Sequence, residues 1–488
     1  MNRYLDLPVL EIHALLKNKT IKPLDLVMEA FARIEENKEL NAFITLDKEK
    51  AILAAKALED KEVDSPLFGM PIAIKDNIAT KDLKTTCASK MLENYVPVFD
   101  ATVIKKIKEN NMIIIGKANM DEFAMGSTSR TSYFGAPTNP WDTRKIAGGS
   151  SGGSASLVAA RLAPFSLGSD TGGSIRQPAS YTGIVGMKPT YGRISRYGLT
   201  AFASSLDQIG PMTRTVYENA LLLNILVGQD DKDLTSVSRE PEDFTRLIGQ
   251  DIKGMKIGIP RYFMSDIVAP EIKENIEKVI NLLKENGALV EYIDIKYIDN
   301  AVTLYQIIAM GEASSNLARF DGIRYGYAKE NAASVDDLYS KTRAEGFGRE
   351  VKRRIMVGSY LLSGENASIY YSKALMLRNA IRKSFEEAFA TYDIIIGPTT
   401  TTTAYDLTEE MDNPLKSFLD DVLVIPVNMA GLPGMSVPVG FDQNRMPIGL
   451  HIIGNAFEEA KMYRVGAWVE EQLHLPLHPL EGGHHESI

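Results

Sequence analysis

The sequence predicts an α/β protein in which a large mixed β-sheet is covered by helices on both faces. Short apolar runs of strand length alternate with amphipathic stretches of helical period along most of the chain. The 488 residues are 44% hydrophobic and 24% charged, which is ordinary for a globular protein. Although the length alone would allow about three domains, the sequence has no solenoid repeat and no long low-complexity linker. One large domain is therefore expected.

The first half of the chain is expected to supply a helix, a buried strand and a helix–strand pair. The helix at 20–37 has Pro23 near its start and apolar side chains at helical spacing. The run at 68–75 predicts a buried strand that ends at polar residues. The next helix is expected to be capped by Asp100 and to precede a strand at 112–115. The apolar positions of the first helix are Leu24, Val27, Met28, Phe31 and Ile34.

The same alternation returns in the second half of the chain. A helix at 270–286 is expected to end at Gly287, because glycine readily adopts the left-handed conformation that follows many helices. The remaining predictions are strands at 255–260, 288–295, 393–397 and 447–454, and helices at 372–391 and 457–473.

Charge and cysteine content argue against several classes of protein. The formal net charge of -9 argues against this chain alone gripping a polyphosphate backbone. Cys87 is the only cysteine, so an intrachain disulfide and four-cysteine zinc sites are excluded, and we expect a buried or incidental thiol. Residues 1–19 lack an uninterrupted apolar signal region, and prolines break the apolar segment 422–440. These features predict a soluble, cytoplasmic protein.

Two Gly-Gly-Ser runs lie close together, GGSSGGS at 148–154 and DTGGS at 170–174. Glycine lets the backbone pass close to another group without a Cβ clash. The first run leads into a helix predicted at 155–161, and the second follows an apolar strand at 165–168. Consecutive N–H groups at Thr171, Gly172 and Gly173 suit an oxyanion hole. Taken singly, each run is more often a flexible loop or a phosphate cradle.

A serine in these runs needs a base if it is to act as a nucleophile. The first run satisfies the G-x-S-x-G pattern of α/β-hydrolases, but that mechanism requires a histidine. His451 lies inside the apolar run IGLHIIG, where a core histidine is expected. A neutral lysine also serves as base where burial lowers its pKa from about 10.4. Lys75 ends an apolar strand and is the candidate, although a lysine at a strand end is more often solvated.

Three motifs in this order and spacing resemble the amidase signature family: GMPIAIKDN around Lys75, GGSSGGS, and GSDTGGSIRQPA. The resemblance spans nearly the whole chain. It implies that Ser174 is the nucleophile, Ser150 a bridging serine on a cis peptide bond, and Lys75 the general base. It also implies one domain over 1–488. This domain would comprise an N-terminal helical segment at 1–60, a catalytic core at 61–220 and a substrate-specificity and partner-contact region at 221–488, with approximate bounds.

Within this family, three further stretches resemble the glutaminase subunits of tRNA-dependent amidotransferases: 311–327, 350–363 and 420–434. The resemblance implies that one cation and one anion hold the zwitterionic substrate.

By this resemblance, Arg354 would hold the α-carboxylate of glutamine and Asp421 its α-ammonium group. Asp420 lies beside Asp421, so the alternative of a neighbouring carboxylate stays open. Arg354 belongs to a basic cluster that is open to a second interpretation, a solvated surface. Tyr305 and Gln306 are weaker candidates for lining the pocket.

The implied activity is hydrolysis of L-glutamine through an acyl-enzyme, with the ammonia passing to a partner subunit. That partner would use ATP and magnesium to activate a tRNA-bound glutamate, and a small third subunit would complete a heterotrimer. No cofactor or metal is expected in this chain, and tRNA would bind through the complex. Two alternatives stay open, a stand-alone amidase acting on a small neutral amide and a non-catalytic scaffold.

Overall fold

The structure is a computed structural model that describes residues 3–409 and 419–479. Its strands are β1 Phe43–Leu46, β2 Pro71–Lys75, β3 Ile113–Ala118, β4 Thr138–Asn139, β5 Asp142–Ile146, β6 Phe165–Asp170, β7 Val185–Lys188, β8 Gln208–Thr213, β9 Lys256–Pro260, β10 Leu289–Ile293, β11 Ile394–Pro398, β12 Gly434–Phe441 and β13 Pro447–Gly454.

The helices are α1 Val9–Lys17, α2 Pro23–Glu36, α3 Lys48–Leu58, α4 Thr102–Glu109, α5 Gly152–Ala159, α6 Arg176–Thr182, α7 Val216–Leu226, α8 Pro270–Glu285, α9 Ala301–Asn316, α10 Val335–Gly346, α11 Arg349–Leu362, α12 Ser372–Phe389, α14 Ile425–Ala430 and α15 Glu459–Leu473. Within the described ranges, none of these helices has the length and apolarity needed to span a bilayer.

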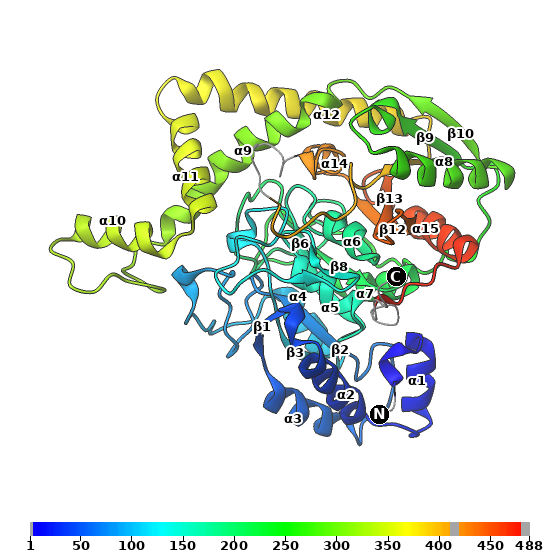
Figure 1. Cartoon of the computed structure of the whole chain (residues 1–488), viewed down its shortest axis with the longest axis horizontal. Helices are drawn as coiled ribbons and strands as arrows, with labels where there is room; N and C mark the ends of the chain where they lie inside the picture. The colour runs from blue at the N-terminus through cyan, green and yellow to red at the C-terminus, as the bar shows by residue number, and fades with distance from the viewer. Residues whose placement is uncertain (1–2, 410–418, 480–488) are drawn as a thin grey trace, which may run out of the picture.

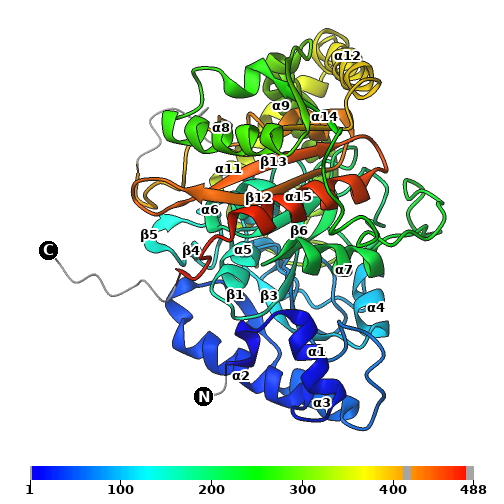
Figure 2. The ribbon, with the colours of Figure 1, turned by 90° about the vertical axis from the view of Figure 1, so that its right-hand side faces the viewer.

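One sheet of 11 strands runs through the molecule in the order β1-β3-β2-β6-β8-β7-β12-β13-β11-β9-β10. It contains both parallel and antiparallel pairs, and helices cover both of its faces (Figure 1). Helices α1 to α3 lie at one end of the molecule, and α8 and α12 lie at the other (Figure 2). The predicted α/β class with a mixed sheet is confirmed.

The parallel pairing around β2 determines where polar residues can gather. Strand β2 pairs in parallel with β3 on one side and with β6 on the other. All residues of β2 and β6 are buried. Because the carboxyl ends of parallel strands meet at one edge of a sheet, Lys75 at the end of β2 and Asp170 at the end of β6 come together there.

The elements predicted from the sequence are present, with ends shifted by a few residues. The ending of α8 is as predicted, since Gly287 has a φ of 87°. The predicted cap of α4 is wrong: the N-cap is Ala101, and the Asp100 carboxylate instead accepts a hydrogen bond from Lys81 N at 2.8 Å. Met28, one of the apolar positions at helical spacing, does not face the core. It is 43% exposed, because residues 100° apart on a helix leave only part of an apolar run facing the core.

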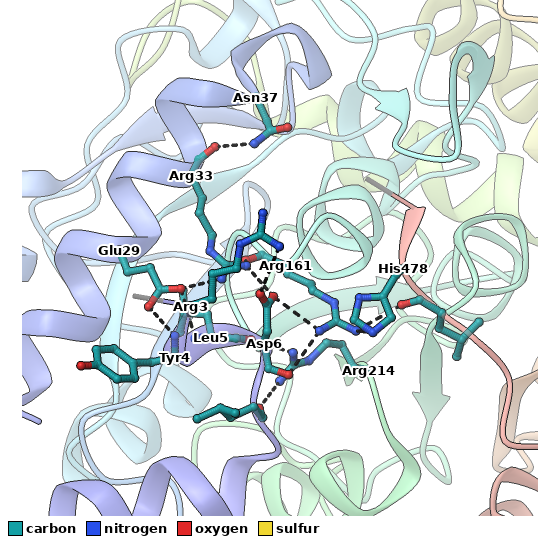
Figure 3. Close-up of polar contacts among 12 residues, drawn as sticks. Arg3, Tyr4, Leu5, Asp6, Glu29, Arg33, Asn37, Arg161, Arg214 and His478 are labelled. Atoms are coloured by element: carbon teal, nitrogen blue, oxygen red, sulfur yellow. Dashed lines mark hydrogen bonds and ion pairs between the residues drawn. The ribbon is translucent and has the colours of Figure 1, made fainter. Parts of the chain in front are cut away.

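The N-terminal segment is attached to the rest of the molecule by the Asp6 carboxylate (Figure 3). Its Oδ1 accepts hydrogen bonds from Arg33 of α2 at 2.8 Å and from Arg161 at 3.4 Å. Arg161 also donates to the carbonyl of Leu477, which follows the last helix, at 3.3 Å. Segments near both ends of the described chain therefore form hydrogen bonds with Arg161, which follows α5.

We expect Asp6→Asn to lower the free energy of unfolding by about 1 kcal/mol, a modest value because the side chain is partly exposed. Burial raises the pKa of Asp6, but Arg33 and Arg161 outweigh it and hold the pKa below its ordinary value. The contribution is therefore present above the unfolded-state pKa of about 4 and is lost as the pH falls through the lower, folded-state pKa.

Urea denaturation of the variant and the wild type at neutral pH and at about pH 3 measures this difference. Asp266→Asn is the control, since the Asp266 side chain is fully exposed and its ion-pair distance to Lys273 is 3.4 Å. Equal destabilisation by both substitutions would contradict the assigned role of Asp6.

Candidate active site

Lys75 is buried with 0% exposure at the carboxyl end of β2. Its Nζ lies 2.8 Å from Ser150 Oγ, 2.8 Å from Ser151 Oγ and 3.2 Å from the carbonyl oxygen of Ser169. Burial lowers the pKa of Lys75 to about 7, although nearby carboxylates, Asp121 foremost, act in the opposite direction. The alternative of a solvated lysine is therefore wrong, and burial brings the pKa of this amine close to neutral pH.

The Ser150 loop has a cis peptide bond between Gly149 and Ser150, as the resemblance implied. The Gln177 side chain holds this loop, accepting from Gly149 N at 2.9 Å and donating to the carbonyl of Ser127 at 2.8 Å. The Asp121 amide donates to the carbonyl of Ser150 at 3.2 Å. A Cβ at position 149 would lie 2.2 Å from Asp121 Oδ2, so only glycine fits beside this carboxylate.

Ser174 lies between β6 and α6, in the second Gly-Gly-Ser run. Its carbonyl accepts a hydrogen bond from Ser151 N at 3.2 Å, which joins the two serine loops. The Ser174 side chain is buried, and within the described ranges its hydroxyl makes no hydrogen bond. The structure thus links Lys75 to Ser150 directly, and it brings Ser174 to the same place without a hydrogen bond between the Ser150 and Ser174 hydroxyls.

The predicted oxyanion donors do not all have a free N–H group. Gly173 N donates to Asp170 Oδ1 at 2.8 Å, so in this structure that amide is already engaged. The Thr171 and Gly172 amides make no hydrogen bond within the described ranges, and their role stays a prediction. The Ser174 amide is likewise without a partner there, a donor that the sequence interpretation did not consider.

The Asp170 carboxylate organises the second serine loop. It accepts from Arg176 at 3.0 and 3.1 Å, from Ile175 N at 3.1 Å and from Asn428 at 2.7 Å. Burial of Asp170 raises its pKa, but the charge and hydrogen bonds of Arg176 outweigh this and hold the pKa well below its ordinary range. Asp170 therefore stays ionised and fixes the loop that carries Ser174.

His451 is a core histidine, as expected from its apolar run. It is buried, and its Nε2 lies 3.0 Å from Arg176 Nη1. Burial and the charge of Arg176 lower its pKa well below the ordinary value. Within the described ranges it makes no hydrogen bond with Ser150 or Ser174, so the α/β-hydrolase interpretation has no base.

Tyr305 and Asp421 pack against the second serine loop. A Cβ at Gly172 would lie 2.7 Å from the Tyr305 ring, and one at Gly173 would lie 2.6 Å from Asp421 Oδ1. That oxygen is buried and has no hydrogen-bond partner among the residues that the structure describes. Burial raises the pKa of Asp421 well above its ordinary value, and the negative charge of Asp420 adds to this. A cation brought beside Asp421 would relieve this cost.

Asp420, the neighbouring candidate, binds side chains outside the second serine loop. Its Oδ2 accepts a hydrogen bond from the Tyr405 hydroxyl at 2.8 Å and one from Ser127 at 3.3 Å. The structure therefore brings Asp421, rather than Asp420, against the loop that carries Ser174.

Arg354 lies on the buried side of α11 with 4% exposure. Its Nε donates to Glu350 Oε1 at 2.7 Å, and its guanidinium lies 5.5 Å from the centroid of the Phe202 ring. Arg353 has a side chain that is 37% exposed, so the solvated alternative describes Arg353 but not Arg354. Gln306 is half-buried, and its side chain makes no hydrogen bond in the described part of the chain.

Three residues of the site were missed from the sequence. Ser151 shares the Lys75 amine with Ser150, and its adjacency to Ser150 in the motif was the available signal. Asp170 opens the DTGGS run, and Gln177 lies in the quoted IRQPA segment, but neither had an assigned role. Their partners come from residues distant in sequence, as when Gln177 reaches Ser127, and no local pattern predicts such pairs.

Comparison with known proteins identifies the family to which this chain is similar. The model of the family described as Amidase matches residues 25–462. The chain is 53% identical over 471 residues to the A subunit of glutamyl-tRNA(Gln) amidotransferase from Pediococcus pentosaceus, covering 96% of this chain and 97% of that protein. It is 52% identical to the protein of the same name from Staphylococcus epidermidis, covering 94% and 96%.

Solved structures resemble the chain over nearly its whole length. The crystal structure of the A subunit of glutamyl-tRNA(Gln) amidotransferase from Thermotoga maritima aligns with a TM-score of 0.80 and 40% identity, covering 97% of this chain and 96% of that one. Native peptide amidase from Stenotrophomonas maltophilia aligns with a TM-score of 0.82 and 25% identity, covering 99% and 100%.

We expect Asp170→Asn to lower the free energy of unfolding by about 3–5 kcal/mol, because it leaves the Arg176 guanidinium buried without its carboxylate. Thermal unfolding of the purified variant measures the loss. Glu59→Gln, which breaks the exposed 2.7 Å pair with Lys22, is the matched control and is expected to cost less than about 1 kcal/mol. If both variants unfold alike, the Asp170–Arg176 pair is not the support assigned to it.

Proposed function

The chain belongs to the amidase signature family, and from this premise we propose that it is the glutamine-hydrolysing subunit of a tRNA-dependent amidotransferase. The observation that carries the proposal is the buried Asp421 oxygen beside the loop of Ser174, and this oxygen has no hydrogen-bond partner within residues 3–409 and 419–479. A small neutral amide would leave this carboxylate uncompensated, so the alternative of a stand-alone amidase is less favoured. The near-full-length similarity to amidotransferase A subunits supports the same choice.

In the proposed complex, the α-ammonium group of L-glutamine pairs with Asp421 and the α-carboxylate pairs with Arg354. Arg354 offers a planar guanidinium whose Nε donates to Glu350 at 2.7 Å, and the planar shape of this group suits a carboxylate. Tyr305 packs against Gly172 of the serine loop, and burial raises the pKa of its hydroxyl while the charge of Arg354 acts to lower it. Gln306 remains a weaker candidate for the wall of the pocket.

The proposed nucleophile is Ser174, which attacks the side-chain carbonyl carbon of glutamine. Its proton passes to Ser150, while Ser150 gives its own proton to the neutral amine of Lys75. The N–H groups of Thr171 and Gly172 would stabilise the oxyanion of the tetrahedral intermediate. Each such donor typically contributes about 2.7–4 kcal/mol to lowering the barrier.

The surroundings of Lys75 suit a neutral amine. Such an amine has two N–H donors and one lone pair, and the structure surrounds it with three oxygens. The carbonyl oxygen of Ser169 can only accept, so it takes one N–H, and Ser151 Oγ takes the other. Because the Ser151 hydroxyl donates to the carbonyl of Ser169 at 3.2 Å, the lone pair of a neutral amine would accept from the Ser150 hydroxyl, whose oxygen lies 2.8 Å from Nζ, and this is the direction that a general base requires.

Collapse of the intermediate breaks the carbon–nitrogen bond, and Lys75 returns the proton through Ser150 to the leaving ammonia. Water then hydrolyses the γ-glutamyl ester of Ser174 to glutamate. We propose that the ammonia passes to a partner, the B subunit, which binds tRNA and uses ATP and magnesium to activate glutamyl-tRNA(Gln), and that a small C subunit completes a cytoplasmic heterotrimer. Both of these cofactors belong to the partner in this proposal.

Ammonia release from L-glutamine by the natively purified protein, together with its co-purifying subunits, tests the proposal. We expect stimulation by ATP-magnesium and glutamyl-tRNA(Gln), because coupling prevents waste of ammonia.

Ser174→Ala should reduce glutamine hydrolysis by at least about 1,000-fold while the variant still co-purifies with its partners. Turnover of simple neutral amides without glutamine hydrolysis would identify a stand-alone amidase. Full activity of Ser174→Ala would remove Ser174 as the nucleophile.

The pH dependence of kcat/KM for glutamine should follow the protonation of Lys75. Since the base is the neutral amine and its pKa is about 7, the rate should rise about tenfold per pH unit below 7 and level off above it. Lys75→Arg should be inactive across the range, because a guanidinium does not deprotonate. A steady-state glutamate assay from about pH 5.5 to 9 measures this dependence. A flat profile would contradict the assignment of Lys75 as base.

A further inference from the structure

Glu122 is a buried carboxylate outside the serine loops whose partners lie far away in the sequence. Its Oε1 and Oε2 accept from the backbone N–H of Gly348 at 3.1 and 2.9 Å, and Ser89 Oγ donates to Oε1 at 2.5 Å. Gly348 is the N-cap residue of α11 and has no side chain with which to cap the helix. A glutamate more than two hundred positions away therefore accepts the N–H of the N-cap, one of the four donors that a helix start leaves unpaired.

The residues on either side of Glu122 extend this attachment in both directions. The Phe123 ring lies 5.6 Å from that of Phe347, the residue before Gly348. In the other direction, the Asp121 amide donates to the carbonyl of Ser150 at 3.2 Å. Three consecutive residues thus connect the cis peptide loop of Ser150 with the beginning of α11.

The beginning of α11 controls the position of Arg354 in its second turn. Glu350, in the first turn, accepts from Arg354 Nε at 2.7 Å. A helix is a stiff element with a rise of about 1.5 Å per residue, so a shift of its first turn carries Arg354 with it. A Cβ at Gly348 would lie 2.2 Å from Glu122 Oε2, which shows how closely the two segments meet.

We propose that Glu122 is a positioning residue that sets the place of Arg354 relative to Ser150 and its neighbouring catalytic groups. The inference rests on the proposed glutaminase function, in which Arg354 holds the α-carboxylate of the substrate. Glu122 does not touch the reacting atoms. Its carboxylate fixes the distance between the cation that holds one end of glutamine and the serine loops that act on the other end.

The electrostatic setting of Glu122 supports this role. Burial raises its pKa to about 7, against the donors Ser89 and Gly348 and the charge of Lys352, which all act to lower it. An ionised carboxylate stabilises a helix N-terminus. A glutamine side chain at position 122 has no charge, and its NH₂ group would face the donors of Ser89 and Gly348 without accepting from them. Assays at about pH 8 keep the carboxylate largely ionised in the wild type.

The test is Glu122→Gln in the complex, assayed for glutamine hydrolysis at about pH 8. We expect KM for glutamine to rise about three- to tenfold while kcat stays within about twofold, because substrate binding weakens but the serines and Lys75 are untouched. In an Arg354→Lys background the same substitution should change KM by less than about twofold, since both changes affect one contact.

Glu11→Gln is the matched control, because Glu11 is an exposed glutamate in the first turn of α1, and it should leave both constants unchanged. If Glu122→Gln does not yield folded protein, Ser89→Ala keeps the carboxylate, removes one donor, and should raise KM about two- to threefold. An unchanged KM, or equal losses in kcat and kcat/KM, would overturn the inference. A wild-type complex that does not hydrolyse glutamine would instead overturn the proposed function.

Discussion

The burial of one amine at the edge of a sheet is the constraint on which the rest of the site depends. Lys75 ends a strand that is covered on both faces, so water does not solvate its amine. A buried lysine is tolerated only if its charged form is disfavoured or if oxygens surround it. Here both conditions are met, and the oxygens come from the Ser150 loop and from β6. The same burial that costs stability supplies a base near neutral pH.

The buried carboxylates of the structure differ in their partners. Asp170 is matched by Arg176, and Asp76 lies 3.8 Å from Lys117, so these groups hold the fold together. Asp421 has an oxygen with no partner inside the described part of the chain. A buried carboxylate oxygen without a partner favours a cation from outside, because a nearby positive charge would offset the cost of burying the negative one. An amino acid with a free ammonium group supplies such a charge.

The sequence predicted the candidate reacting residues better than the hydrogen bonds that hold them in place. Lys75 was found as the polar end of an apolar strand and Ser150 through the resemblance to a known family, and the structure brings the two together at 2.8 Å. The engagement of Gly173 N by Asp170 was not predictable, because glycine-rich loops look alike until their hydrogen bonds are known. The contact of Glu122 with Gly348 was beyond any sequence pattern, since it joins segments 226 positions apart. Such pairs form only when the chain folds, and the hydrophobic periodicity of the sequence does not predict them.

This division between local motif and distant support also explains how one fold accommodates several amides. The lysine and the serines belong to strand ends and loops between residues 75 and 174, which the rigid sheet holds in place. The groups proposed to bind the α-ammonium and α-carboxylate end of the substrate come from α9, α11 and the segment before α14. The peptide amidase that aligns with a TM-score of 0.82 has only 25% identity, so the scaffold persists while most side chains differ. The attachment of α11 to Glu122 is separate from the sheet that holds the serine loops, so the contacts to the rest of the substrate can differ while the serines keep their place.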